Sequence, residues 1–170
     1  MEVRIFRGFG GKIFSTGMDR LHEKIQTECK HLNSTIIDGY DNWNKHVQHI
    51  KTINHPVVLI GHSFGALASY KIVSELNSVD FPLVVSFDYS PYYSGIVDHK
   101  PNGVVPANVH SAINFYQEVD PIVRGIKMKR EDGSDYQIAN IEGKCAHVEI
   151  DKVDVFHKNV IKAIRNIYGI

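Results

Sequence analysis

The five residues Gly61-His62-Ser63-Phe64-Gly65 match a Gly-x-Ser-x-Gly motif, and they lie between an apolar run and a segment with helical periodicity. A serine in this position is held in a sharp strand-to-helix turn, which lifts its hydroxyl above the sheet. The flanking glycines let such a turn close, because larger side chains would collide with neighbouring backbone. The dipole of the following helix can stabilise negative charge beside the hydroxyl. The motif therefore predicts a nucleophile at Ser63; the alternative is a serine that only caps the helix.

A serine hydroxyl needs a base within hydrogen-bonding distance before it can attack a carbonyl, and an imidazole is the usual one. We expect His147 to be that base, because it follows the last predicted strand and precedes the last predicted helix. There its ring would reach the carboxyl edge of the sheet. His157 falls inside that helix, and His62 is expected to point away from the elbow and to support the turn. An exposed loop position without a role is the alternative for His147.

Two aspartates could orient the imidazole, and both follow strands of the predicted sheet. Asp88 comes directly after residues 83–87, whereas Asp120 follows the next strand by a few residues. Asp120-Pro121 is also typical of a helix N-cap with proline at the first helical position. Asp88 has a weaker structural explanation, as an Asx turn. We therefore favour Asp88 as the acid and keep Asp120 as the alternative.

An acyl-transfer site also needs two backbone N–H donors aimed at the oxyanion that forms during attack. Phe64, directly after the serine, would supply one. The glycine-rich turn Gly8-Phe9-Gly10-Gly11 follows the first predicted strand and would supply the other through the N–H of Phe9. Such a turn could instead hold a phosphate, but it lacks the Gly-x-Gly-x-x-Gly order.

Strand and helix patterns alternate along the whole chain without a linker or repeat, so we expect one α/β domain over residues 1–170. Its core is a mostly parallel sheet between two helical layers. Four consecutive apolar residues at 57–60 suit a central strand buried on both faces. The other strands are expected at 3–6, 35–37, 83–87, within 109–116 and at 137–141. Helices are expected from Thr16, where Thr16 and Asp19 form a capping box, and at 43–50, 64–76 and 153–167.

Two segments depart from this alternation. Residues 88–108 join two parallel strands but contain three prolines, so a long loop is expected there instead of a crossover helix. Tyr89, Tyr92 and Tyr93 lie on this loop and are expected to line a substrate pocket. Asp132-Gly133 falls between short alternating stretches, which predicts a hairpin turn within residues 129–134.

The composition argues against several other classes of protein. Lysine plus arginine equals aspartate plus glutamate at 19 each, so no net field would attract nucleic acid or anionic lipid. Two cysteines are too few for a disulfide framework or a cysteine zinc site, and the ten histidines show no metal-binding spacing. No apolar stretch approaches the roughly 20 residues of a membrane span, and the N-terminus reads as a strand and not as a leader. We therefore expect a cytoplasmic protein, without metal or cofactor, that acts on a small molecule.

The elbow motif, the glycine-rich turn and the chain order serine, acid, histidine resemble the α/β-hydrolase superfamily of esterases, lipases and thioesterases. Members often carry His-Gly-Phe after the first conserved strand, and Arg7-Gly8-Phe9 is similar apart from its arginine. The segments 105–109, 113–117 and 147–151 look like those of short, cap-less lipase-like and thioesterase-like proteins of bacteria and phages.

This resemblance covers nearly the whole chain and implies a minimal six-stranded fold without a helical cap. It implies hydrolysis of a carboxylic ester or thioester through an acyl-enzyme on Ser63, with His147 and an aspartate. In the short relatives the acid ends the strand after the elbow helix, here Asp88; in many larger esterases it follows the next strand, here Asp120. The rival functions are acyl transfer or amide cleavage on the same residues, and a non-catalytic binding module on a hydrolase scaffold.

Overall fold

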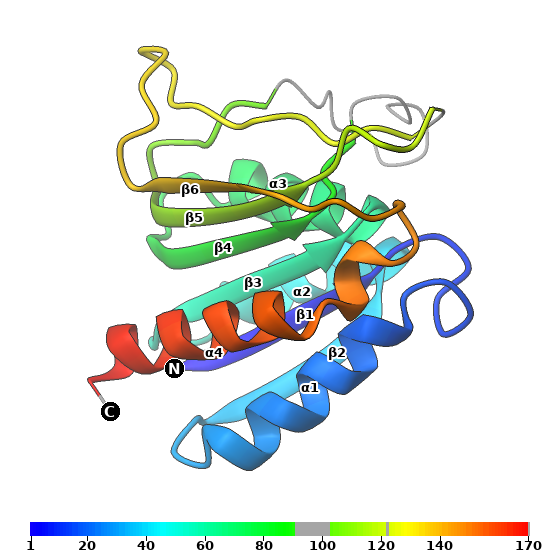
Figure 1. Ribbon diagram of the computed structural model, residues 1–170. Helices are drawn as coiled ribbons and strands as arrows, with labels where there is room; N and C mark the ends of the chain where they lie inside the picture. The colour runs from blue at the N-terminus through cyan, green and yellow to red at the C-terminus, as the bar shows by residue number, and fades with distance from the viewer. Residues whose placement is uncertain (91–102, 122, 170) are drawn as a thin grey trace.

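The computed structural model describes residues 1–90, 103–121 and 123–169 (Figure 1). Six strands in these ranges form one sheet, in the order β2-β1-β3-β4-β5-β6, and every neighbouring pair is parallel. The strands are β1 (Glu2–Arg7), β2 (Ser34–Gly39), β3 (Val57–His62), β4 (Phe81–Phe87), β5 (Val109–Tyr116) and β6 (Ile138–Glu142). The predicted six-stranded α/β sheet is therefore confirmed.

Helices cover both faces of the sheet, which gives three layers. The α-helices are α1 (Thr16–Glu28), α2 (Trp43–Ile50), α3 (Phe64–Glu75) and α4 (Asp154–Tyr168). Helices α1 and α4 lie on one face, and α2 and α3 on the other (Figure 1). Short 3-10 segments, η1 (Tyr40–Asn42) and η3 (Ile150–Lys152), precede α2 and α4. Within the described ranges, none of the helices combines the length and the apolar character needed to cross a membrane.

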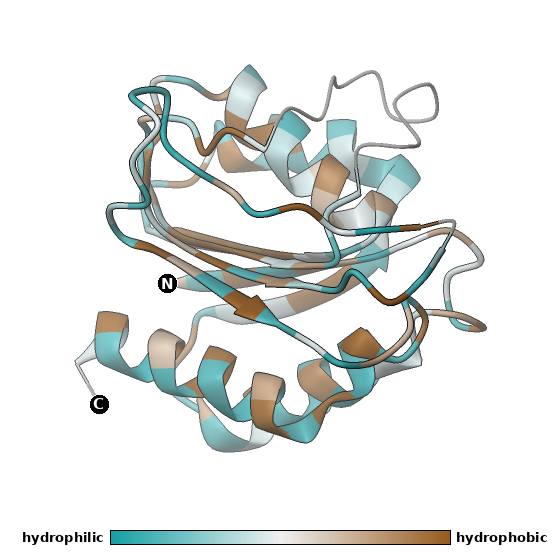
Figure 2. Ribbon diagram, turned by 45° about the horizontal axis from the view of Figure 1, so that its top comes forward, coloured by the Kyte–Doolittle hydropathy of each residue, from teal (hydrophilic) through white to brown (hydrophobic). Residues whose placement is uncertain are grey.

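The apolar core consists of two clusters, one under each pair of helices. Strand β3 supplies both: Val57 and Leu59 belong to the cluster under α2 and α3, while Val58 and Ile60 belong to the cluster under α1 and α4. All four side chains are buried. Figure 2 shows hydrophobic strands at the centre of the molecule between helices that carry both hydrophobic and hydrophilic positions. An uninterrupted apolar run fits this strand because neither of its faces meets water.

The start of α1 differs from the predicted capping box. The N-cap is Ser15, whose hydroxyl makes no capping bond, and Asp19 pairs with Arg7 instead. The Gly17 N–H donates to Asp151 Oδ2 at 2.9 Å, although Asp151 lies 134 residues further along the chain. The helix is therefore capped by a tertiary contact, which local sequence could not indicate.

The predicted hairpin at residues 129–134 is also wrong. A turn does form: the Arg130 N–H bonds to the Ser134 carbonyl at 2.7 Å, and Gly133 adopts a φ of 83°. The described residues around this turn belong to no strand, and β5 and β6 pair in parallel. Turn chemistry is local, whereas the pairing of these strands is set by the sheet as a whole.

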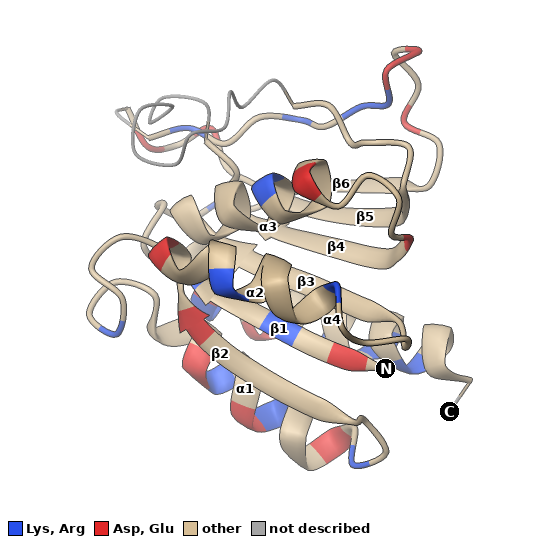
Figure 3. Ribbon diagram, turned by 180° about the vertical axis from the view of Figure 1, so that it is seen from behind, with Lys and Arg blue, Asp and Glu red and all other residues tan. Residues whose placement is uncertain are grey.

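Most charged residues lie on the surface with both signs interspersed, as along α1 in Figure 3. One charged cluster is buried where β1 packs near α2. Arg4 forms an ion pair with Glu2 and a hydrogen bond with His46, and all three residues are at most 5% exposed. His46 also bonds to Asp38 at 3.2 Å. Mutual pairing lets these polar groups stay inside, because an unpaired buried charge would be costly.

Candidate active site

Ser63 lies in a strained turn between β3 and α3. Its φ of 57° and ψ of −120° are unusual for a residue that carries a side chain. A Cβ at Gly61 would lie 2.2 Å from the Gly65 backbone, and a Cβ at Gly65 would lie 2.1 Å from the Phe6 carbonyl oxygen. The two glycines of the motif are therefore required by the close approach of backbone on either side of the serine.

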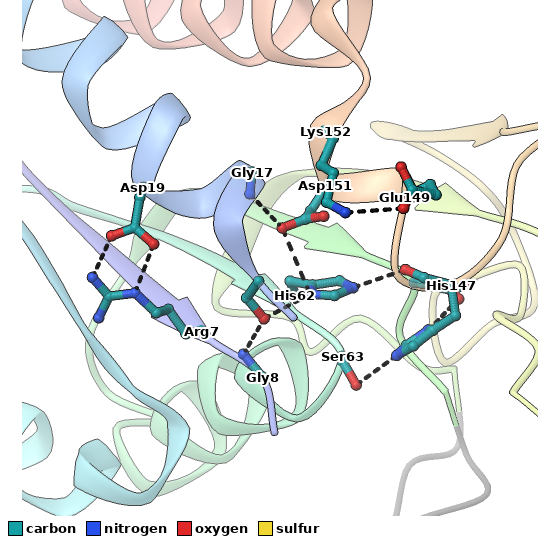
Figure 4. Close-up of polar contacts among 12 residues, drawn as sticks. Arg7, Gly8, Gly17, Asp19, His62, Ser63, His147, Glu149, Asp151 and Lys152 are labelled. Carbon is teal, nitrogen blue, oxygen red and sulfur yellow. Dashed lines mark hydrogen bonds and ion pairs between the residues drawn. The ribbon is translucent and has the colours of Figure 1, made fainter. Parts of the chain in front are cut away.

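The Ser63 hydroxyl points to His147 and makes no capping bond to α3. Its Oγ lies 2.9 Å from His147 Nε2 (Figure 4). His147 comes from the loop between β6 and η3, at the carboxyl edge of the sheet. Its side chain is 12% exposed, so the ring is largely shielded but still borders the cleft described below. The structure thus brings together the predicted serine and histidine, which are 84 residues apart.

Asp88 completes this chain of hydrogen bonds from the end of β4. It is fully buried, and its Oδ2 lies 2.6 Å from His147 Nδ1. A carboxylate can only accept a hydrogen bond, so His147 Nδ1 carries the proton in this contact. In the neutral ring, Nε2 is then left without a proton and can accept one from Ser63. The arrangement can therefore generate a serine nucleophile.

Gln117 is a polar partner of Asp88 that the sequence reasoning missed. Its side-chain amide donates to Asp88 Oδ2 at 2.8 Å, and its backbone N–H lies 3.3 Å from Asp88 Oδ1. Gln117 follows β5 directly, at the same sheet edge as Asp88, and that position was the available signal. These two donors hold the carboxylate so that it faces His147.

The other aspartate, Asp120, occupies a turn. Its backbone N–H donates to Gln117 Oε1 at 2.7 Å, and its Oδ1 accepts from the Val123 N–H at 3.0 Å. In the described part of the chain no helix begins at Asp120, so its interpretation as a helix N-cap is wrong. The structure brings Asp88 and not this alternative within 2.6 Å of the imidazole.

An apolar cleft of about 340 Å³ opens beside Ser63. Phe9 and Phe64, the expected backbone donors, both line it, and their rings meet edge to face with centroids 6.2 Å apart. Among the described residues, the Phe9 N–H has no hydrogen-bond partner. Among the described residues, the cleft is lined by Phe9, Phe14, His62, Ser63, Phe64, Val123, His147 and Val148.

The expectation that Tyr89 lines the pocket needs correction. Tyr89 is 1% exposed and packs in the core against Tyr70, with ring centroids 5.2 Å apart, so it does not line the cleft. Tyr92 and Tyr93 lie outside the described residues. In the described part of the chain, phenylalanine and valine side chains supply the apolar walls.

His62 lies behind the site, with its ring centroid 5.0 Å from that of His147. Burial is the main cause that lowers the pKa of His62 to about 3, and the neighbouring His147 adds to it. Burial also raises the pKa of Asp151 to about 6, partly offset by the Gly17 N–H. The ring of His62 therefore stays neutral near pH 7. The neighbouring carboxyl group of Asp151 is ionised only above a pH of about 6.

No group of three histidine, cysteine, aspartate or glutamate side chains in the described ranges is arranged to hold a metal ion.

Comparison with known proteins finds similarity in structure alone. No protein-family model and no curated protein matches the sequence. A candidate hydrolase of the α/β superfamily from Xanthomonas campestris pv. campestris aligns with a TM-score of 0.60 and 12% identity, over 99% of this chain and 98% of that one. A candidate YdeN-like hydrolase from Pectobacterium atrosepticum aligns with a TM-score of 0.60 and 16% identity, over 95% of this chain and 90% of that one.

A third similar structure is the RedJ thioesterase from the prodiginine biosynthetic pathway in Streptomyces coelicolor. It aligns with a TM-score of 0.53 and 10% identity, over 95% of this chain and 85% of that one. At such low identities these likenesses show the fold and nothing finer. The chain has the fold of the α/β-superfamily hydrolases, in a minimal six-stranded form with no cap domain in the residues described.

Proposed function

We propose that this protein is a serine hydrolase that cleaves a carboxylic ester or thioester. The observation that carries this proposal is the hydrogen-bonded chain from Ser63 Oγ through His147 to Asp88, with distances of 2.9 and 2.6 Å, on a strained elbow. The fold shared with α/β-superfamily hydrolases and a thioesterase is consistent with it. A purely structural serine would have no need of a positive φ, which costs of order 1–3 kcal/mol.

In the proposed reaction, Ser63 Oγ attacks the substrate carbonyl while His147 Nε2 takes its proton. Asp88 stabilises the imidazolium that results and remains ionised. The backbone N–H groups of Phe9 and Phe64 donate to the oxyanion of the tetrahedral intermediate. When the intermediate collapses, His147 returns the proton to the leaving alcohol or thiol, and the acyl group stays on Ser63.

Deacylation repeats the same steps with water as the nucleophile. His147 removes a proton from the water as it attacks the acyl-enzyme, and a second tetrahedral intermediate forms in the same oxyanion site. Its collapse releases the carboxylic acid and restores the Ser63 hydroxyl. The apolar lining of the cleft beside Ser63 favours a hydrocarbon acyl group over a charged one.

Hydrolysis of p-nitrophenyl butyrate and of butyryl-coenzyme A tests this proposal. We expect activity of the wild type toward at least one of them, and Ser63→Ala should lower kcat by about 10⁴ or more. Ser74→Ala is the matched control, because Ser74 is an exposed serine later in α3 that bonds to the Tyr70 carbonyl. Equal activity of the wild type and Ser63→Ala would refute the proposal.

A further inference from the structure

Two loops far apart in the sequence must hold their relative position for the proposed reaction to proceed. One is the turn after β1 that carries Gly8 and Phe9, and the other is the loop that carries His147. The buried side chain of His62 lies between them (Figure 4). Its Nε2 lies 3.1 Å from the His147 carbonyl oxygen, and its Nδ1 lies 2.9 Å from Ser15 Oγ.

The protons in these contacts can be assigned from the chemistry of the partners. The His147 carbonyl can only accept, so His62 Nε2 must carry a proton and donate it. In a neutral ring, Nδ1 then accepts from the Ser15 hydroxyl. The same hydroxyl oxygen accepts from the Gly8 N–H at 3.0 Å. A continuous run of hydrogen bonds therefore links the backbone before Phe9 to the backbone of His147.

The surroundings of His62 keep this run intact. His62 is 2% exposed and Ser15 is fully buried, so water does not compete for their hydrogen bonds. In the part of the chain that the structure describes, two ionisable groups besides His147 face the ring: the Asp151 carboxylate, 3.9 Å from Nδ1, and Lys152. Asp151 is beyond hydrogen-bonding distance of the ring and is bound by the Gly17 N–H. The low pKa of His62 is consistent with the single neutral tautomer that the run requires.

We infer that His62 is a positioning residue that fixes the His147 imidazole relative to the oxyanion donor at Phe9. This inference rests on the proposed hydrolase function. His62 acts through the backbone of Gly8 and of His147 and does not contact the hydroxyl that reacts. His62 directly precedes Ser63 in the elbow, and its ring is hydrogen-bonded to the His147 backbone and, through Ser15, to the backbone of Gly8. One side chain therefore connects the nucleophile, the base and the turn that carries Phe9.

Three variants separate the two hydrogen bonds of His62. His62→Leu removes both, His62→Gln keeps a donor for the His147 carbonyl, and Ser15→Ala breaks only the link to Gly8. With p-nitrophenyl butyrate we expect His62→Leu to lose about 10- to 100-fold in kcat, because small displacements of reacting groups cost that much. KM should change little, and His62→Gln should recover most of the lost kcat. Ser15→Ala should show a smaller loss of kcat.

His46→Leu is the control, because His46 is another buried histidine that hydrogen-bonds to two partners away from the cleft. It should lower the melting temperature as His62→Leu does, yet leave kcat per folded molecule unchanged. If the wild type is active and a folded His62→Leu or Ser15→Ala has the same kcat, the positioning role of His62 would be overturned while the proposed function would stand. The positioning role would also be overturned if kcat fell in both His62→Leu and His46→Leu only in proportion to the fraction of unfolded protein. A wild type that hydrolyses neither test substrate would overturn the proposed function itself.

Discussion

The imidazole of His147 makes two hydrogen bonds, and each limits what the ring can do. The buried Asp88 accepts from Nδ1, which leaves Nε2 to face Ser63. Asp88 is itself held by two donors of Gln117, so its orientation does not depend on His147 alone. This arrangement assigns the acid role to Asp88 in the proposed mechanism and gives Asp120 a local role in a turn.

The asparagine variants of the two aspartates test that assignment. Asp88→Asn keeps the size of the side chain but removes the charge that stabilises the imidazolium, so kcat should fall by at least about 10² and by up to about 10⁴. Asp120→Asn should keep nearly all activity, because an amide oxygen can still accept from the Val123 N–H. Steady-state kinetics on folded protein decide between them. The opposite pattern would move the acid to Asp120, and no loss in either variant would contradict the triad.

The buried neutral His62 makes folding stability depend on pH. The pKa of its ring is about 3 in the folded chain, against 6.5 as the ordinary value. Between those values the unfolded chain binds a proton that the folded chain does not, so the stabilisation is complete above pH 6.5 and is lost as pH falls toward 3. The free energy of unfolding of the wild type minus that of His62→Gln should therefore shrink by about 2 kcal/mol between pH 7 and pH 5.

Urea unfolding of both proteins at the two pH values measures this difference. His31→Gln, at an exposed position, controls for the loss of an imidazole elsewhere in the chain. If the difference in the free energy of unfolding between the two proteins stayed constant or grew from pH 7 to pH 5, His62 would be protonated in the folded protein. The proton assignment in its hydrogen bonds would then be wrong.

At the scale of the elements, the close contact between α3 and β1 sets the elbow. Gly65 lies in the first turn of α3, where the higher helix propensity of alanine would ordinarily stabilise the helix by about 0.5–1 kcal/mol. An added Cβ would instead lie 2.1 Å from the Phe6 carbonyl oxygen of β1. We expect Gly65→Ala to lower the free energy of unfolding by about 2 kcal/mol or more, because the helix must move off the strand.

Urea unfolding again gives the result, with Gly133→Ala as a comparison. Apart from its two chain neighbours, no described residue comes within 4 Å of a Cβ added at Gly133, but its φ is 83°, so the alanine variant should cost only about 1–2 kcal/mol of backbone strain. A Gly65→Ala protein as stable as the wild type would mean that the helix and strand are not in the contact described.

At the scale of the whole molecule, the features that depend on local pattern could be predicted from the sequence. The strands and helices follow from apolar periodicity, and parallel strands bring their carboxyl ends to one edge, where Ser63, Asp88 and His147 all lie. The side chains that depend on three-dimensional packing could not be predicted in this way. Both aspartates follow strands at that edge, and only the turn after β5 places Gln117 against Asp88.

The same limit explains the wrong predictions. Tyr89 is buried because α3 places Tyr70 against it, and the cap of α1 comes from Asp151 near the other end of the chain. The turn at Asp132-Gly133 forms without a hairpin, because β6 pairs in parallel with β5. Each of these features depends on residues distant in the sequence, and no local signal identifies such partners.

The most direct test of the account is covalent labelling by a fluorophosphonate, followed by intact-mass measurement and peptide mapping. Ser63 Oγ lies 2.9 Å from Nε2 of His147, whose other ring nitrogen is hydrogen-bonded to Asp88. Ser63 also lines the open cleft. We expect one adduct per chain, on the peptide that contains Ser63, and no adduct in Ser63→Ala. Labelling of Ser63→Ala at the wild-type rate, or no adduct on the folded wild type, would contradict the central claim that Ser63 is a nucleophile.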